Sequence, residues 1–186
     1  MLESTASAAH LHWNAEGAAL VAEALRNNVG SRQTVRLRVH GESMLPTLWP
    51  GDVVEIESCS CEDVQPGEIV LAQREDRLFL HRLVSRCTPN GFVMCGDSMP
   101  APDPQYTSEA LLGRLVRREE AGRFSEAILR RGMASNWLGL KSLRAVGILL
   151  CYSGMARTFA LKFYHRRNTW ARGPLSAEAA AEQESL

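Results

Sequence analysis

Lysine is scarce in this sequence. Of the 21 basic residues only Lys141 and Lys162 are lysines, and both lie near the C-terminal end of the chain. A lysine acting as a base is therefore excluded from the whole stretch before Lys141. Aromatic residues are also few, at 6% of the chain, but 45% of the 186 residues are hydrophobic, which is enough for the core of one modest domain.

Long apolar runs are missing as well. Residues 145–155 are apolar for only eleven positions between Arg144 and Arg157, whereas a helix that crosses a bilayer needs about 20 apolar residues. The N-terminal segment has no such run either, and it lacks the basic start and apolar centre of an export signal. We therefore expect a cytoplasmic protein, with membrane association possible only at the surface.

Cysteine occurs five times, an odd number. In a chain without an export signal, reduced thiols in a cytosolic compartment are the default expectation. Two of the cysteines, in Cys59-Ser60-Cys61, have the wrong spacing for a zinc knuckle, so we expect no metal site and no cofactor. The others are Cys87, Cys95 and Cys151.

The most informative segment is residues 41–52, Gly-Glu-Ser-Met-Leu-Pro-Thr-Leu-Trp-Pro-Gly-Asp, which lead into the apolar residues 53–56. Gly41 permits a sharp backbone turn and Pro46 prevents a helix, so we expect Ser43 on an exposed turn. The Gly-Asp pair at the end is typical of a tight turn into a strand. An ordinary loop before a strand is the alternative to a nucleophilic serine.

A second segment, residues 77–84, is typical of a buried strand with one ionisable pair, His81-Arg82, in its middle. A serine hydroxyl is a weak nucleophile that needs a neighbouring base. Imidazole titrates near neutrality and acts as a base without burial. We predict that His81 is this base, the alternative being a structural histidine that bonds a backbone carbonyl. His40, just before the serine turn, is a candidate for substrate contact.

A third segment, residues 96–103, reads Gly-Asp-Ser-Met-Pro-Ala-Pro-Asp and follows the short apolar run at 92–95. Its carboxylates, Asp97 and Asp103, are candidates for orienting a histidine. A carboxylate that accepts a hydrogen bond from one imidazole nitrogen fixes the tautomer of the ring. Asp97 is equally compatible with a simple Asx turn.

These three segments, together with Pro-Gly-Glu-Ile-Val at 66–70, resemble the signal peptidases and the LexA-like serine peptidases. The histidine in place of the lysine base is similar to the signal peptidases of the endoplasmic-reticulum type. The resemblance covers about residues 35–118 and implies that Ser43 is the nucleophile and His81 the general base. It further implies that Asp103 orients the histidine and that Asp97 supports it. The segment before the serine is too short for a repressor's DNA-binding module and contains no Ala-Gly or Cys-Gly cleavage site.

The sequence departs from this family at two points. Gly41 stands where many bacterial signal peptidases have a serine that helps to bind the oxyanion, and losing one such donor costs about 100-fold to 1000-fold in rate. Prolines and a methionine replace the asparagines of the third segment. We expect a peptide substrate to contact Gly41, Met44 and Pro46. A non-catalytic peptide-binding module on the same fold is the alternative to a serine endopeptidase that cleaves a leader or precursor peptide.

Short apolar runs separated by Pro-Gly, Asn-Gly and Gly-Asp turns predict a mainly β, antiparallel domain with helical N- and C-terminal extensions. The domain boundaries that we expect are an N-terminal helical extension at 1–33, the β-domain at 34–120, a basic amphipathic helical segment at 121–172 and a disordered tail at 173–186. The expected helix is residues 15–26, and the expected strands are 35–40, 53–57, 68–73, 78–86, 91–95 and 111–117.

Charge is distributed unevenly. Residues 1–122 carry 11 basic and 17 acidic side chains, whereas residues 123–172 carry 10 basic and one acidic. Basic flanks and aromatic ends would let residues 137–164 lie on an anionic membrane surface, and packing against the domain is the alternative. No recognition motif for nucleic acid is present. The resemblance to the signal peptidases implies that the partner is a peptide or protein substrate.

Overall fold

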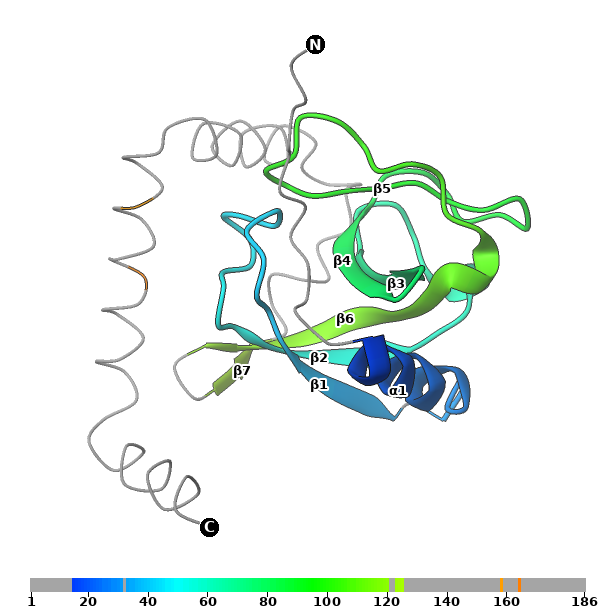
Figure 1. Cartoon of the computed structure of the whole chain (residues 1–186), viewed down its shortest axis with the longest axis horizontal. Helices are drawn as coiled ribbons and strands as arrows, with labels where there is room; N and C mark the ends of the chain where they lie inside the picture. Colours follow the sequence, from blue (N-terminus) through cyan, green and yellow to red (C-terminus); the bar gives the residue numbers. More distant parts are fainter. Residues whose placement is uncertain (1–14, 32, 121–122, 126–157, 159–163, 165–186) are drawn as a thin grey trace.

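The short apolar runs form the strands of one antiparallel sheet (Figure 1). Our computed structural model describes residues 15–31, 33–120, 123–125, 158 and 164. The sheet has seven strands in the order β1-β2-β6-β3-β4-β5, with β7 paired to β6. The expected mainly β, antiparallel fold is confirmed. The strands are β1 (Thr34–Arg38), β2 (Val53–Ser58), β3 (Ile69–Arg74), β4 (Arg77–Leu83), β5 (Met94–Cys95), β6 (Leu111–Glu120) and β7 (Arg123–Ser125).

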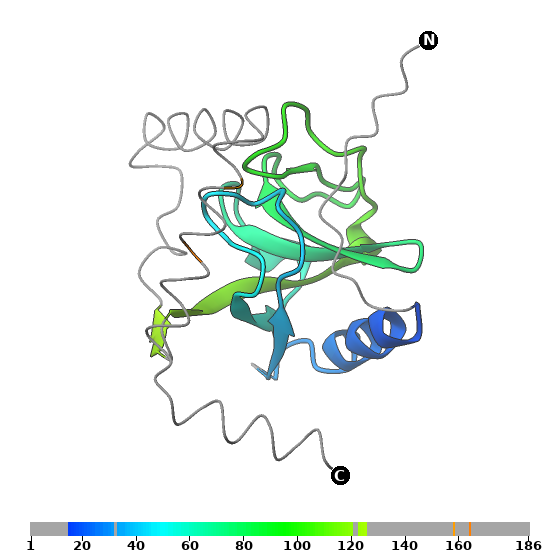
Figure 2. The same ribbon diagram turned by 60° about the vertical axis from the view of Figure 1, so that its left-hand side comes forward.

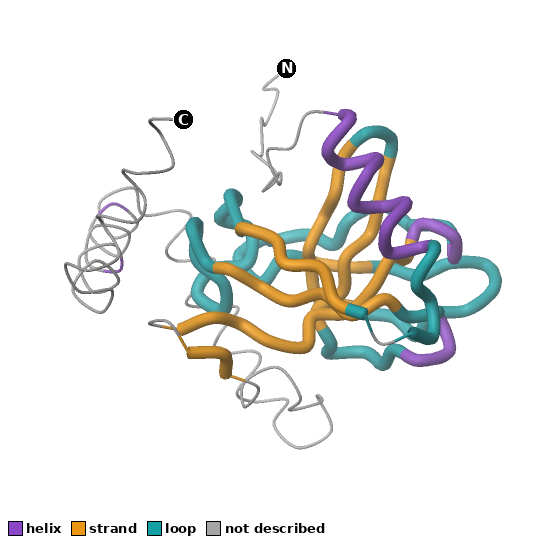
Figure 3. The backbone as a smooth tube through the Cα atoms, turned by 90° about the horizontal axis from the view of Figure 1, so that it is seen from below, coloured by secondary structure: helices purple, strands orange, loops and turns teal. Residues whose placement is uncertain are grey.

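Helix α1 (Ala15–Arg26) has the bounds that the sequence predicts, and it packs on β1, β2, β4 and β6. Its buried residues, Ala18, Val21, Ala22 and Leu25, recur every three or four positions and form one apolar face. Figure 3 shows the helix beside the strands. The Leu25 carbonyl accepts a hydrogen bond of 2.5 Å from the buried hydroxyl of Ser58 on β2, which fixes the helix to the sheet.

Two hydrophobic cores lie on the sheet. The first lies beneath α1 and includes Leu37, Ile56, Leu71 and Leu112. The second is built around Phe92 and Tyr106, whose rings stack with centroids 5.4 Å apart, and includes the 3-10 turns η1 (Cys61–Asp63) and η2 (Ser108–Ala110) at its border.

The last part of the sheet differs from the sequence prediction. The expected strand 91–95 is reduced to β5, because Phe92 instead pairs with Tyr106 in an isolated bridge. Strand β4 ends at Leu83 rather than at residue 86. Strand β6 continues to Glu120 and turns back through β7, so the sheet extends past the boundary that we expected at residue 120.

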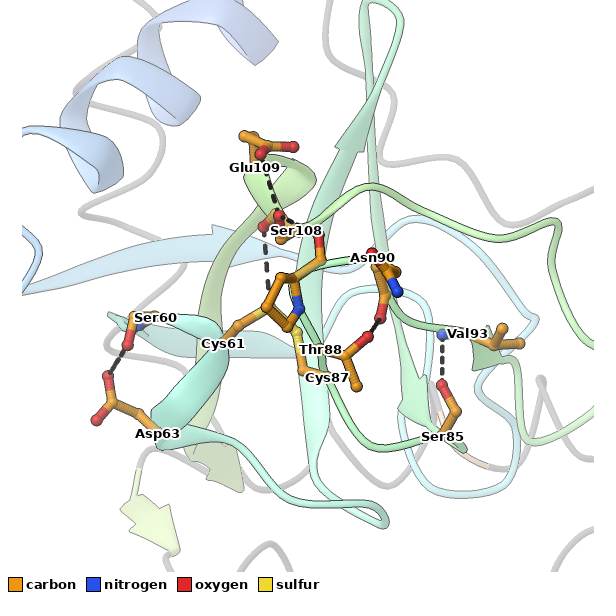
Figure 4. The surroundings of a disulfide bond; sticks show 12 residues. Ser60, Cys61, Asp63, Ser85, Cys87, Thr88, Asn90, Val93, Ser108 and Glu109 are labelled. Atoms are coloured by element: carbon orange, nitrogen blue, oxygen red, sulfur yellow. Dashed lines mark hydrogen bonds between the residues drawn. A yellow bond between two sulfur atoms is a disulfide. The ribbon is translucent and has the colours of Figure 1, made fainter.

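Cys61 and Cys87 form a disulfide at the edge of the second core, with Cα atoms 5.3 Å apart (Figure 4). The expectation of reduced thiols was wrong for this pair, because the fold brings η1 against the loop after β4. Cys59 and Cys95 are buried. Burial raises the pKa of Cys59 to about 12.

Most of the predicted basic segment and tail, residues 121–172 and 173–186, lies outside the described residues, as do residues 1–14. Within the described residues, no helix combines the length and apolar character needed to cross a membrane. Tyr164 is described, and it contacts the loop between β1 and β2.

Candidate active site

The loop between β1 and β2, residues 39–52, carries the predicted nucleophile and is closed at its base by two backbone bonds. The Val39 N–H donates to the Asp52 carbonyl at 2.8 Å, and the Gly51 N–H donates to the Val39 carbonyl at 2.6 Å. Gly51 has a φ of +94°, in the left-handed region that favours glycine. We call this segment the β1–β2 loop.

Ser43 lies in a turn of this loop, as predicted. We expected an exposed residue, but Ser43 is buried, with an exposed fraction of 3%. It is buried because the segment after β5 packs against it. A Cβ on Gly96 would lie 2.6 Å from the Ser43 carbonyl oxygen and 3.0 Å from the Ser43 Cβ. Only a glycine at position 96 allows this approach. Figure 2 shows the light-blue β1–β2 loop rising beside the green segment that follows β5.

The fold brings Ser43, His81 and Asp103 into one hydrogen-bonded chain. The Oγ of Ser43 lies 2.6 Å from Nε2 of His81, and the Nδ1–H of His81 donates to Oδ2 of Asp103 at 2.6 Å. His81 lies on β4 opposite Val70 of β3 and is 1% exposed. The Asp103 backbone N–H donates to the Met94 carbonyl, which fixes its loop against β5. A hydroxyl, an imidazole and a carboxylate in this order are the parts of a catalytic triad.

Asp103 is the carboxylate that bonds His81, whereas Asp97 bonds other residues. It accepts two hydrogen bonds from Arg82, at 2.8 and 2.7 Å, and one from the Thr47 hydroxyl at 2.5 Å. The remaining terminal nitrogen of Arg82 donates to the Gly67 carbonyl at 2.6 Å. This buried ion pair ties β4 and the turn before β3 to the β1–β2 loop.

The three residues that we expected to contact substrate, Gly41, Met44 and Pro46, differ in their exposure. Met44 is 2% exposed and packs in the first core with Leu48, so its side chain is a support of the loop rather than a contact surface for substrate. Gly41 and Pro46 are partly exposed, and His40 is exposed. The exposed flank of the loop is therefore formed by the residues around Ser43 and not by Met44.

Sequence reasoning missed three residues of the site: Thr47, Arg82 and Ser98. Arg82 was visible as the neighbour of His81, but nothing in the sequence paired it with Asp97. Ser98 donates from its backbone N–H to the Ser43 carbonyl and from its hydroxyl to the Glu42 carbonyl, both at 2.9 Å. Its position in the Gly-Asp-Ser segment was the only available signal.

An antiparallel β-domain that holds a Ser-His-Asp chain defines a protein of the serine-peptidase-like class. A family model described as Peptidase S24-like matches residues 6–112, more than half of the chain. The protein therefore belongs to the Peptidase S24-like family, and the predicted relationship to the signal peptidase and LexA-like superfamily is confirmed. Comparisons with curated proteins and with solved structures gave no significant match.

Proposed function

We propose that this protein is a serine endopeptidase similar to the signal peptidases, which cleaves an extended leader or precursor peptide. The observation that carries the proposal is the hydrogen-bonded chain from Ser43 through His81 to Asp103, with both heavy-atom distances at 2.6 Å. These distances lie within the reach that proton transfer requires. Membership of the Peptidase S24-like family supports a peptidase-like fold.

The geometry supports a specific order of proton transfers. His81 Nε2 takes the proton of Ser43 Oγ as that oxygen attacks the scissile carbonyl. The imidazolium is stabilised by Asp103, which accepts its Nδ1–H. His81 then gives the proton to the leaving amine, and an ester of Ser43 remains. Water, deprotonated by the same imidazole, hydrolyses this ester and restores the serine.

The sheet suggests how a peptide would bind. Strand β5 has only two residues, and its register with β4 ends at Arg82, next to the proposed base. An extended peptide that continues along this side of β4 would pass the Ser43–His81 pair, as in other cases of strand addition. We expect small residues before the scissile bond, as the resemblance to signal peptidases implies.

Cleavage of a peptide library with small residues before the cut tests this proposal. Wild type should cleave a subset of the peptides, and Ser43→Ala should cleave none. Ser58→Ala is the matched control, because Ser58 is also buried but bonds the Leu25 carbonyl beneath α1. If wild type binds peptides without cleaving them, the alternative of a non-catalytic peptide-binding module is favoured instead.

A further inference from the structure

Ser98 is the residue of the site whose role the triad leaves unexplained. It is 1% exposed, yet it is polar and comes from a different loop than Ser43. Through its hydroxyl and its N–H it holds two consecutive carbonyls of the β1–β2 loop, those of Glu42 and Ser43, each at 2.9 Å. The Glu42 carbonyl also accepts the Leu45 backbone N–H at 3.1 Å, so Ser98 and Leu45 together fix the orientation of the peptide unit that joins Glu42 to Ser43.

That peptide unit carries the Ser43 N–H. In a planar trans peptide, the C=O and the following N–H point in opposite directions. Since the Glu42 carbonyl points at the Ser98 hydroxyl, the Ser43 N–H points away from it. Within the part of the chain that the structure describes, this N–H has no hydrogen-bond acceptor, although Ser43 is nearly buried. Buried backbone N–H groups without a partner are rare.

A free, oriented N–H beside the attacking oxygen is what a developing oxyanion requires. Gly41 offers no side-chain donor that would share this role. We propose that Ser98 is a positioning residue, whose hydroxyl aims the Ser43 N–H at the oxyanion of the tetrahedral intermediate. This inference rests on the proposed endopeptidase function.

The test compares Ser98→Ala, Ser98→Thr and Ser58→Ala in the full chain with the best peptide of the library. Ser98→Ala removes only the hydroxyl, since the backbone bond to the Ser43 carbonyl stays. Losing a whole oxyanion donor costs about 100-fold to 1000-fold, so misdirecting one should lower kcat about 10-fold or more with KM unchanged. Ser98→Thr should restore kcat, because the hydroxyl is kept. Ser58→Ala loses a bond of the same kind and should keep its kcat.

Three outcomes separate the claims. A kcat that falls in Ser98→Ala and not in Ser58→Ala supports the positioning role. An equal kcat in both variants, or a change in KM alone, overturns that role and leaves the proposed function intact. A wild type that cleaves no peptide overturns both.

A second inference rests on a separate contact, between Tyr164 and the base of the β1–β2 loop. The rings of Tyr164 and Trp49 stack with centroids 4.7 Å apart and planes 10° apart, and the Tyr164 hydroxyl donates to Oδ1 of Asp52. The Asp52 side chain is completely buried, and its other oxygen accepts a hydrogen bond from the backbone N–H of Trp49 at 2.9 Å. An aromatic face beside a buried carboxylate matches the two ends of a tyrosine side chain.

Hydrogen bonds and an ion pair connect this contact to other residues of the β1–β2 loop and to Asp97. Arg118 of β6 lies 3.8 Å from the Asp52 carboxylate and donates to the Thr47 carbonyl at 2.6 Å. The Thr47 side chain in turn donates to Asp97. We infer that Trp49 and Asp52 form a docking surface for Tyr164 of the chain's own C-terminal segment, and that docking holds the β1–β2 loop in place.

The indole N–H signal of Trp49 in a ¹H–¹⁵N NMR spectrum of the full chain tests this docking without any substrate. The signal is assigned by its loss in Trp49→Phe. Tyr164→Ala should shift it, since the stacked ring is removed, and Tyr164→Phe should shift it less. Tyr106→Phe, whose ring stacks on Phe92 in the second core, is the control and should leave it unchanged. A Trp49 signal that Tyr164→Ala does not move, or that Tyr106→Phe moves equally, overturns the inference.

Discussion

At the scale of single residues, the site depends on the close approach of the backbone at Gly96 to Ser43. Gly96 lies where the loop after β5 touches Ser43, and a Cβ there would come within 2.6 Å of the Ser43 carbonyl oxygen. Backbone atoms cannot yield to such a contact as the end of a flexible side chain can. The loop or the serine must move when residue 96 gains a side chain.

We therefore predict that Gly96→Ala displaces Ser43 from His81 and reduces kcat/KM. A displacement of about 1 Å is enough to cost on the order of 100-fold in rate. Gly51→Ala is the comparison variant, since a Cβ at Gly51 meets no atom within 4 Å, although its φ of +94° brings backbone strain. Steady-state kinetics on one peptide, with melting temperatures alongside, would refute the prediction if Gly96→Ala kept the wild-type rate.

The residue types of the triad could be predicted from the sequence, but only through family resemblance. The segments around Ser43, His81 and Asp103 carry recognisable patterns, whereas the distances between them depend on contacts that are remote in sequence, such as the pairing of β4 with β5 and the bond from Ser98 to the Ser43 carbonyl. Asp97 shows the limit of this reasoning, because one carboxylate in a Gly-Asp-Ser turn has several partners within reach. The fold selects Arg82 rather than His81, and no local pattern encodes that choice.

At the scale of elements, the second core depends on long-range contacts. The disulfide joins η1 to the loop after β4 across 26 residues of sequence. Strand β5 is short because Phe92 pairs with Tyr106, fourteen positions away in the sequence. Helix α1 could be predicted with its exact bounds because its signal is a local period, whereas the end of β4 and the length of β5 are set by partners distant in the sequence.

Removing the disulfide should lower stability. Cross-links that close loops of this size contribute about 2–4 kcal/mol by restricting the unfolded chain. We predict that Cys87→Ser has a lower melting temperature than wild type. A reducing agent should lower the melting temperature of wild type and leave that of Cys87→Ser unchanged. Equal melting temperatures for oxidised wild type and Cys87→Ser would contradict the prediction.

The second core should also lose stability in alkali through Cys59. Burial raises the pKa of this thiol from its ordinary value of 9.0 to about 12. Between these two values the unfolded chain has released a proton that the folded chain still binds, so the free energy of unfolding falls as pH rises. The contribution is fully present below pH 9. Denaturant unfolding below and above pH 9 should show a steeper alkaline loss for wild type than for Cys59→Ala, and equal slopes would exclude the thiol as the cause.

At the scale of the whole molecule, the sheet order brings together segments that are far apart in the chain. The β1–β2 loop, β4 and the segment after β5 meet at one buried ion pair, Asp97–Arg82, with side chains 3% and 11% exposed. This ion pair holds together the three parts that carry Ser43, His81 and Asp103. The expected membrane contact of residues 137–164 stays a prediction.

Asp97→Ala should therefore destabilise the whole domain. Removing one partner of a buried ion pair costs about 3–5 kcal/mol, because the other charge is left without compensation. Glu57→Ala is the control, since its pair with Arg114 is more exposed and such pairs contribute about 0–1 kcal/mol. Chemical denaturation of both variants checks this prediction. A similar small loss for the two would show that the buried pair does not hold the domain together.

The most direct test of the proposed mechanism is the pH dependence of kcat/KM for wild type and His81→Ala on one cleaved peptide. If His81 is the general base, the wild-type profile should show a limb in which kcat/KM falls at acidic pH, because a protonated imidazole cannot accept the proton of Ser43. His81→Ala should lose both the rate and this limb. A wild-type profile without the limb, or a His81→Ala variant that cleaves like wild type, would contradict the Ser43–His81–Asp103 mechanism.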